Sequence, residues 1–387
     1  MANLLFYIAV FCSILSQCPQ FLDTPITRIL QATWGVAAIF LFFRNGKAAI
    51  TPSTRILLGG LFIFFVYLFT CDTFSLNSYF TADLINISIA VMIAIVSYMW
   101  WDAYHSSLNL KILAVVILVA CFILVYFIYN ESLQTLDLSK KSDVYDAKNS
   151  AAQIIMASAL VGFVCLHPRK KLYKIALFGA VIGLSVMVFY LRSRATILSW
   201  GIAALYLLFT VRNKKVRRII IAAIFAIVLI IVCIPEFYTV VFDQILLSGR
   251  DQNDLNDVSS GRLGIIEGLT DYVYKYPIFG IGQKYVDCFP FAMLLQYGLV
   301  GFTIVMVYLY KITYMSWKVR KLNDITKCAF ILLISYFVNS IFEAQTPFGP
   351  GAKCEILWIF YGMMLTYYDK WSREEQYRVQ LEKFKNR

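Results

Sequence analysis

The feature that most constrains this chain is a succession of apolar blocks, each about 15–20 residues long, that runs from end to end. A helix of about 20 apolar residues crosses the hydrocarbon core of a bilayer. The sequence therefore predicts an all-α, polytopic integral membrane protein with about twelve transmembrane helices, and the shorter blocks leave ten to thirteen open. The predicted spans are roughly 3–17, 29–43, 56–71, 83–100, 110–129, 150–166, 172–191, 195–211, 218–234, 291–310, 328–343 and 354–368.

Composition supports this class and excludes others. Of the 387 residues, 60% are hydrophobic and 15% are charged, whereas a soluble domain has about 45–50% and about 25%. Soluble enzymes, secreted disulfide scaffolds and disordered chains are therefore excluded. The chain has two histidines and nine cysteines; the cysteines lie mostly in apolar blocks and include no CxxC pair, so we expect core residues and no metal site.

The basic residues predict the orientation. With twelve spans and the N-terminus inside, 24 of the 35 Lys and Arg residues fall on one side of the membrane, and cytoplasmic loops carry such an excess. We therefore expect residues 1–387 to form a single transmembrane domain with both termini in the cytoplasm. Residues 369–387 would be a charged cytoplasmic tail. The net charge of +12 then reflects topology, and no nucleic-acid partner is expected.

The long loop, residues 236–290, is predicted to be extracytoplasmic and ordered. Ser259 or Ser260 is a good helix N-cap, and apolar residues recur at helical spacing over 262–275. Pro277 ends this predicted helix, because the residue before a proline is pushed out of the helical region. Two glycines follow, Gly280 and Gly282, which permit a tight turn or a close approach of backbones.

Three arginines on the predicted outer side are candidate anion ligands. Arg262 lies in the first turn of the loop helix, where free N–H groups also attract anions, so it suits a phosphate or pyrophosphate. Arg192 and Arg194 lie in a tight outer connector, against the positive-inside bias. The alternatives are a surface Arg262 paired with Glu267, with Asp257 or with neither, and connector arginines that snorkel at a helix end.

Carboxylates on the same side are candidate general bases. Glu267 and Asp271 share one face of the loop helix with Lys275, so either carboxylate is a general base or the face is simply solvated. Glu343 and Glu355 bracket a stiff turn rich in proline and glycine. Either could line a polar cavity, and we favour a role as caps of their spans.

Three pieces of sequence together resemble the O-antigen polymerase and ligase superfamily of bacterial envelopes. They are the connector Ser193-Arg194-Ala195, the segment Ser259-Ser260-Gly261-Arg262 with its helix and Pro277-Ile278-Phe279-Gly280-Ile281-Gly282, and the run Leu294-Leu295-Gln296-Tyr297-Gly298-Leu299-Val300-Gly301. Their order and spacing carry the resemblance, which covers about residues 190–310. The first half of the chain resembles the family in hydropathy alone.

The resemblance implies a membrane glycosyltransferase whose donor is a glycan on polyprenyl pyrophosphate, at the outer face of the bacterial plasma (inner) membrane. Arg192 or Arg194, with Arg262, would hold the pyrophosphate and stabilise it as it leaves. No metal or other cofactor is then required. The implied partners are the lipid-linked donor and acceptor, the bilayer, and a chain-length regulator or other polysaccharide-assembly membrane proteins.

The sequence departs from the family at one informative position. Many members, the ligases especially, carry a histidine eleven residues before the glycine that corresponds to Gly298, and here that position is Asp287. His105 and His167 both fall on the predicted cytoplasmic side. The base that deprotonates an acceptor hydroxyl would then be a carboxylate, Asp287 first and Glu267 or Asp271 next.

This departure favours a polymerase over a ligase. We expect the chain to polymerise lipid-linked oligosaccharide repeat units into O-antigen, capsular polysaccharide or exopolysaccharide. The alternatives are a ligase that moves finished glycan to another acceptor, a non-enzymatic flippase or permease for the same lipid, and a structural subunit of a biosynthetic complex. A flippase would show repeated halves and charged residues within spans, and a structural subunit would tolerate alanine at all three arginines.

Overall fold

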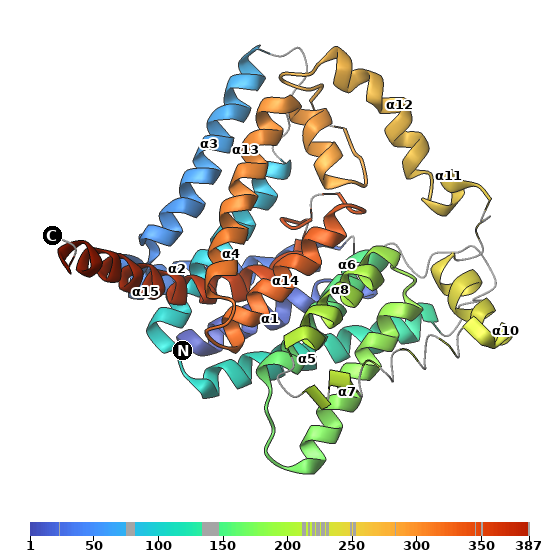
Figure 1. Cartoon of the computed structure of the whole chain (residues 1–387), viewed down its shortest axis with the longest axis horizontal. Helices are drawn as coiled ribbons and strands as arrows, with labels where there is room; N and C mark the ends of the chain where they lie inside the picture. The colour runs from blue at the N-terminus through green and yellow to red at the C-terminus, as the bar shows by residue number, and fades with distance from the viewer. Residues whose placement is uncertain are drawn as a thin grey trace.

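The computed structural model shows a bundle of helices (Figure 1), and no strand is present in the part of the chain that it describes. The described residues are 1–22, 24–74, 82–133, 147–210, 214–215, 217–218, 221, 225, 229, 232–247, 250, 253–282, 284–344, 346–349 and 351–385.

The helices follow the predicted apolar blocks. The first group is α1 (Ala2–Leu15), α2 (Pro25–Asn45), α3 (Pro52–Phe74), α4 (Ala82–Tyr104), α5 (Ser107–Ile128), α6 (Lys148–Cys165), α7 (Lys171–Tyr190) and α8 (Arg194–Thr210). The loop holds α10 (Pro235–Tyr238), the π-helix η4 (Thr239–Leu246), α11 (Leu255–Val258) and α12 (Arg262–Lys275). The chain ends with α13 (Phe289–Val319), α14 (Asp324–Ser340) and α15 (Glu355–Lys385). The ninth predicted block, 218–234, lies largely outside the described residues.

Seven helices of the described part are long and apolar enough to cross a membrane: α2 to α7 and α13. Helices α1 and α8 are apolar but shorter, with 14 and 17 residues. The protein is therefore all-helical and multi-pass. The count of twelve spans stays a prediction.

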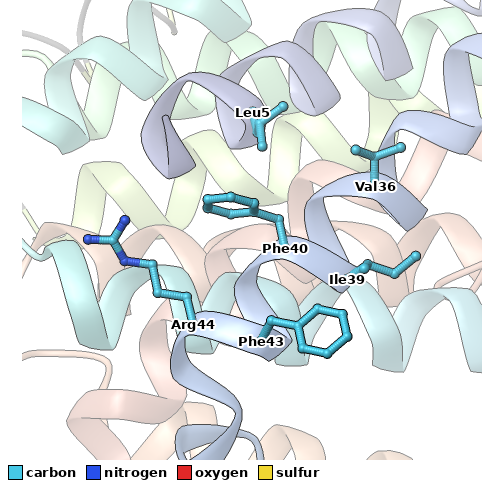
Figure 2. A pocket seen from close by; sticks show the side chains of 6 residues that line it. All are labelled: Leu5, Val36, Ile39, Phe40, Phe43 and Arg44. Carbon is cyan, nitrogen blue, oxygen red and sulfur yellow. The ribbon is translucent and has the colours of Figure 1, made fainter.

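Much of the bundle surface is apolar, as a lipid-facing surface must be. Phe43 is 86% exposed and Phe209 is 69% exposed, which water would disfavour and hydrocarbon would not. Figure 2 shows one groove on this surface, with a volume of about 440 Å³, between α1 and α2. The residues that line it are Leu5, Val36, Ile39, Phe40, Phe43 and Arg44.

Contacts between helix ends respect the predicted sides of the membrane. Bonds between predicted cytoplasmic ends are Trp100 Nε1 to Asn3 Oδ1 (2.9 Å), Tyr98 hydroxyl to Asp369 Oδ2 (3.0 Å) and His167 Nε2 with Asp324 Oδ2 (3.0 Å). Bonds between predicted outer ends are Tyr297 hydroxyl to Asp83 Oδ2 (2.6 Å) and Ser13 to Glu355. In Figure 1, α10 to α12 lie at the right, away from the two termini at the left. The alternation of the helices is thus internally consistent, while the cytoplasmic position of the termini stays a prediction.

Helix α13 is broken at Gly298, and the break receives the segment that follows α12. Gly298 has φ 62° and ψ −171°, a conformation open essentially to glycine alone. The carbonyls of Pro277 and Ile278 accept from the N–H groups of Leu299 (2.8 Å) and Val300 (3.4 Å). In return the N–H groups of Ile281 and Gly282 donate to the carbonyls of Leu295 (2.9 Å) and Gln296 (3.1 Å).

The two glycine motifs noticed in the sequence meet at this junction. A Cβ atom on Gly280 would lie closer than 3.0 Å to the Gln296 carbonyl, and one on Gly298 would lie as close to the Ile278 carbonyl. Both glycines therefore serve a backbone-to-backbone contact. The junction fixes the end of α12 against the outer half of α13.

A small apolar cluster, separate from the main core, holds the rest of α12. Three residues of the predicted apolar face of α12 pack against the segment that leads into α13 and its first turns. The α12 residues are Ile266, Leu269 and Val273, and their partners include Val286, Ala292 and Leu295. We call these residues the satellite cluster.

Candidate functional site

Helix α12 begins at Arg262 and ends at Lys275, as predicted. Its N-cap residue is Gly261, with φ 79°, so the expectation of Ser259 or Ser260 at that position is wrong. Ser259 still satisfies a free donor, because its hydroxyl accepts from the N–H of Leu263 at 3.2 Å. A left-handed residue was needed to turn the chain into the helix, and glycine adopts that conformation at least cost.

Arg194 joins the connector before α8 to the turn before α12. Its guanidinium donates to the carbonyl of Val258 and to the hydroxyl of Ser260. It also interacts electrostatically with Arg250 and Arg262. Two of the three pieces that carry the family resemblance are therefore in direct contact, although 64 residues separate Arg194 from Val258.

A cavity of about 540 Å³ opens at this contact. Arg194, Arg262 and Asp287 supply its charged groups, and most of its remaining wall is apolar. The other lining residues are Ala195, Leu198, Leu255, Val258, Ser259, Leu263, Ile266, Cys288, Ile341 and Phe342. A few convergent polar groups in an otherwise apolar pocket are typical of a ligand site, and the apolar wall suits part of a lipid.

The guanidinium of Arg262 lies between two carboxylates. Its Nη2 atom is 3.4 Å from Asp287 Oδ2 and 3.7 Å from Glu343 Oε1. Tyr285 donates its hydroxyl hydrogen to Asp287 Oδ1 at 2.6 Å. Desolvation, and after it this bond, raises the pKa of Tyr285, so the tyrosine keeps its proton and remains a donor.

Glu343 is the residue that sequence reasoning missed as a neighbour of the arginines. We favoured a capping role, but the structure places its carboxylate beside Arg262, with the residue 7% exposed. Burial raises its pKa above the usual 4.5; Lys353 and Arg262 oppose this effect, and Asp287 adds to it. The sequence did contain one signal of this contact. Glu343 is a carboxylate at the outer end of a predicted span, on the side of the membrane where cations are fewer.

The other candidates lie elsewhere. Arg192 is 3% exposed, has φ 53°, and is not among the described residues that line the cavity. Glu267 and Asp271 lie on the exposed face of α12, opposite the satellite cluster. Their role as general bases stays a prediction, as does the role of Arg192 in holding pyrophosphate.

Within the described part of the chain, no three His, Cys, Asp or Glu side chains are grouped as a metal site requires. The positive charge at the cavity comes from Arg194 and Arg262.

Comparison with known protein families supports the resemblance. Residues 178–299 match the family model described as O-antigen ligase. The match covers the connector, α12, the glycine segment and the break in α13, and so confirms the predicted resemblance to the O-antigen polymerase and ligase superfamily. Comparison with curated proteins gave no significant match.

Proposed function

We propose that this protein is a membrane glycosyltransferase that polymerises polyprenyl-pyrophosphate-linked oligosaccharide units, and that the cavity beside Arg194 and Arg262 is its active site. One observation carries the proposal. Two of the three pieces that resemble the superfamily, the connector before α8 and the segment that begins α12, meet at a single cavity, with two arginines and Asp287 on its wall and a lipid-compatible apolar remainder.

The two arginines suit the pyrophosphate of the donor. Guanidinium groups bind phosphate oxygens through paired, charge-assisted hydrogen bonds. Arg194 is held by the Ser260 turn and Arg262 by its two carboxylates, so both cations are oriented before the substrate arrives. Fixed cations stabilise the charge that develops on a leaving group.

In the proposed reaction, a hydroxyl oxygen of the acceptor unit attacks the anomeric carbon of the donor glycan. A carbon–oxygen bond forms, and the bond between that carbon and the pyrophosphate oxygen breaks. The lipid pyrophosphate departs with the bonding electron pair. The hydroxyl proton passes to a carboxylate, and we assign that role to Asp287 because it lines the cavity.

Glu343 acts through Arg262 in this scheme and is a positioning residue. Its Oε1 atom lies 3.7 Å from Arg262 Nη2, the same atom that approaches Asp287, and Glu343 is not among the described residues that line the cavity. Pyrophosphate binding weakens the pairing of Arg262 with Asp287 by competition. Glu343 then keeps the guanidinium aimed at the cavity.

A polymerase is favoured over a ligase by the aspartate at the position where ligases carry histidine. The same proposal places the protein in the bacterial inner membrane, with the cavity on the outer side and both termini in the cytoplasm. The repeat unit that the cell supplies then decides whether the product is O-antigen, capsular polysaccharide or exopolysaccharide.

The test is a glycan gel from a strain that lacks the gene, complemented with the wild type, Arg262→Ala or Lys275→Ala. The matched control Lys275→Ala removes a cation from the other end of the same helix. We expect a full ladder with the wild type and the control, and single repeat units with Arg262→Ala.

Other outcomes contradict the proposal in distinct ways. Full-length glycan stranded on its lipid in the deletion strain would indicate a ligase. Units trapped on the cytoplasmic face would indicate a flippase. A normal ladder with Arg194→Ala and Arg262→Ala combined would remove the active-site assignment.

A further inference from the structure

A groove with a basic mouth and an apolar interior lies where helices α6, α7 and α14 meet, at the end of the bundle away from the candidate active site. Its mouth has a volume of about 610 Å³. Three cations line it: Arg169 and Lys174 from the connector and first turn of α7, and Lys327 from α14. His167 and Asp324 form a pair across the mouth, with His167 Nε2 3.0 Å from Asp324 Oδ2. The mouth is thus predominantly basic.

The mouth continues into an apolar throat between α6, α7 and α8. The throat has a volume of about 230 Å³. Phe163, Phe178 and Val181 line both cavities, so the two adjoin at these side chains and together make up the groove. The remaining walls of the throat are Ala159, Leu160, Ile182, Ser185, Trp200, Ala204, Leu207 and Leu208.

The groove opens toward the lipid because α7 is a peripheral helix. Of the side chains in α7, those of Val181, Leu184 and Val188 are buried. Phe178 is 60% exposed and Phe163 is 47% exposed. A lipid chain can therefore enter sideways from the bilayer.

The groove and the candidate active site lie at opposite ends of α8. Arg194 begins α8 at the candidate site, and Leu207 and Leu208 line the throat near its other end. A helix of 17 residues is about 25 Å long. The groove thus lies in the other leaflet, which the charge distribution predicts to be cytoplasmic.

We propose that this groove binds an anionic phospholipid of that leaflet, with the phosphate at Arg169, Lys174 and Lys327 and an acyl chain in the throat. Charge complementarity selects the headgroup, since basic pockets between transmembrane helices suit anionic lipids. The apolar throat selects a chain over a soluble phosphate. This inference goes beyond the proposed transfer reaction and does not depend on it.

The groove in Figure 2 is a contrast within the same molecule. It is apolar, but its lining includes one cation, Arg44, and that guanidinium lies 5.3 Å from the centre of the Tyr104 ring. A single cation already engaged by an aromatic ring is a weaker anion site than three basic residues around one mouth.

The test is native mass spectrometry of the purified full-length protein titrated with phosphatidylglycerol, phosphatidylcholine or glycerol phosphate. We expect a retained phosphatidylglycerol, weak phosphatidylcholine binding and no retention of glycerol phosphate. Arg169→Gln combined with Lys174→Gln should weaken phosphatidylglycerol binding about 25-fold, from about fivefold for each cation.

Lys170→Gln combined with Lys171→Gln is the matched control, because these adjacent exposed cations are not among the described lining residues. The control pair should weaken phosphatidylglycerol binding several-fold less than Arg169→Gln combined with Lys174→Gln does. Equal losses in the two pairs would show a diffuse surface charge and overturn the proposal. Equal retention of phosphatidylcholine, or retention of glycerol phosphate, would also overturn it.

Ala204→Phe tests the throat without a change of charge, because Ala204 lies on the throat wall. It should reduce the retained phosphatidylglycerol while leaving the mouth intact. Unchanged binding in a folded Ala204→Phe protein would exclude the throat as the chain site.

Discussion

Replacement of Gly298 by alanine should disconnect the candidate active site from the bundle. Gly298 breaks α13 and lies against the Ile278 carbonyl of the segment that follows α12. An added Cβ would come closer than 3.0 Å to that carbonyl, a separation that real Cβ atoms do not tolerate. One of the two backbone segments, at Gly298 or at Ile278, therefore has to move. Because the Ile278 segment directly follows α12, its displacement would shift α12 as well.

The magnitude follows from two effects. A non-glycine residue at φ 62° and ψ −171° is strained by about 1–3 kcal/mol. The displacement also strains the hydrogen bonds from Leu299 to Pro277 (2.8 Å) and from Val300 to Ile278 (3.4 Å), each worth about 0.5–1.5 kcal/mol. Gly298→Ala should therefore lower the free energy of unfolding by about 2–6 kcal/mol.

Two other glycines separate these effects. Gly261 has φ 79° but open space around its Cβ position, so Gly261→Ala should cost only about 1–2 kcal/mol of conformational strain. Gly268 lies within α12, also with open space and without a positive φ. Gly268→Ala should therefore be neutral or stabilising by up to about 1 kcal/mol.

The assay is reversible unfolding in detergent for all three variants, together with the glycan ladder in cells. The expected order of stability is Gly268→Ala above Gly261→Ala above Gly298→Ala, with the ladder shortened most in the last. A Gly298→Ala protein as stable as Gly261→Ala would refute the close backbone contact. A stable Gly298→Ala protein with a full ladder would refute the dependence of the site on that contact.

The remaining predictions concern the charged groups. Burial raises the pKa of Glu343, so the folded protein holds this proton more tightly than the unfolded chain does. The resulting contribution to the free energy of unfolding is complete below pH 4.5 and declines as the pH rises through the raised pKa. Glu343→Gln should flatten this decline when unfolding is measured as a function of pH. Arg194→Lys should lose one of two bonds that a guanidinium makes to the turn before α12, and limited proteolysis there should accelerate several-fold. Asp287→Asn should abolish the ladder, whereas Glu267→Gln and Asp271→Asn should preserve it; a missing ladder with either exposed-face variant would reassign the base.

Local signals predicted the helices well because each depends on neighbouring residues. The limits of α12 follow from apolar spacing and from Pro277, and both agree with the structure. The identity of the N-cap residue of α12 could not be predicted in this way. Either a serine hydroxyl or the glycine beside it can stand at the start of a helix, and the sequence does not decide between them. Gly261 supplies the backbone conformation and Ser259 supplies the acceptor.

Contacts across the chain were harder to predict. The glycine segment around Gly280 and the glycine at Gly298 are separate pieces of the sequence. They meet through backbone atoms, so no complementary pair of side chains in the sequence indicates that they are in contact. Glu343 was missed for a related reason. A carboxylate next to a span end looks the same whether it caps that helix or faces Arg262, and only the path of the intervening chain decides.

The satellite cluster has a consequence for the way the protein unfolds. Because Ile266, Leu269 and Val273 pack into an apolar cluster distinct from the main core, α12 can detach at a cost set by a few contacts and one backbone junction. Its amides should therefore exchange with solvent deuterium as one cooperative group, well before those of the bundle. The same local opening would widen the cavity beside Arg262 and, under the proposed function, would give a long glycan a path out of the site.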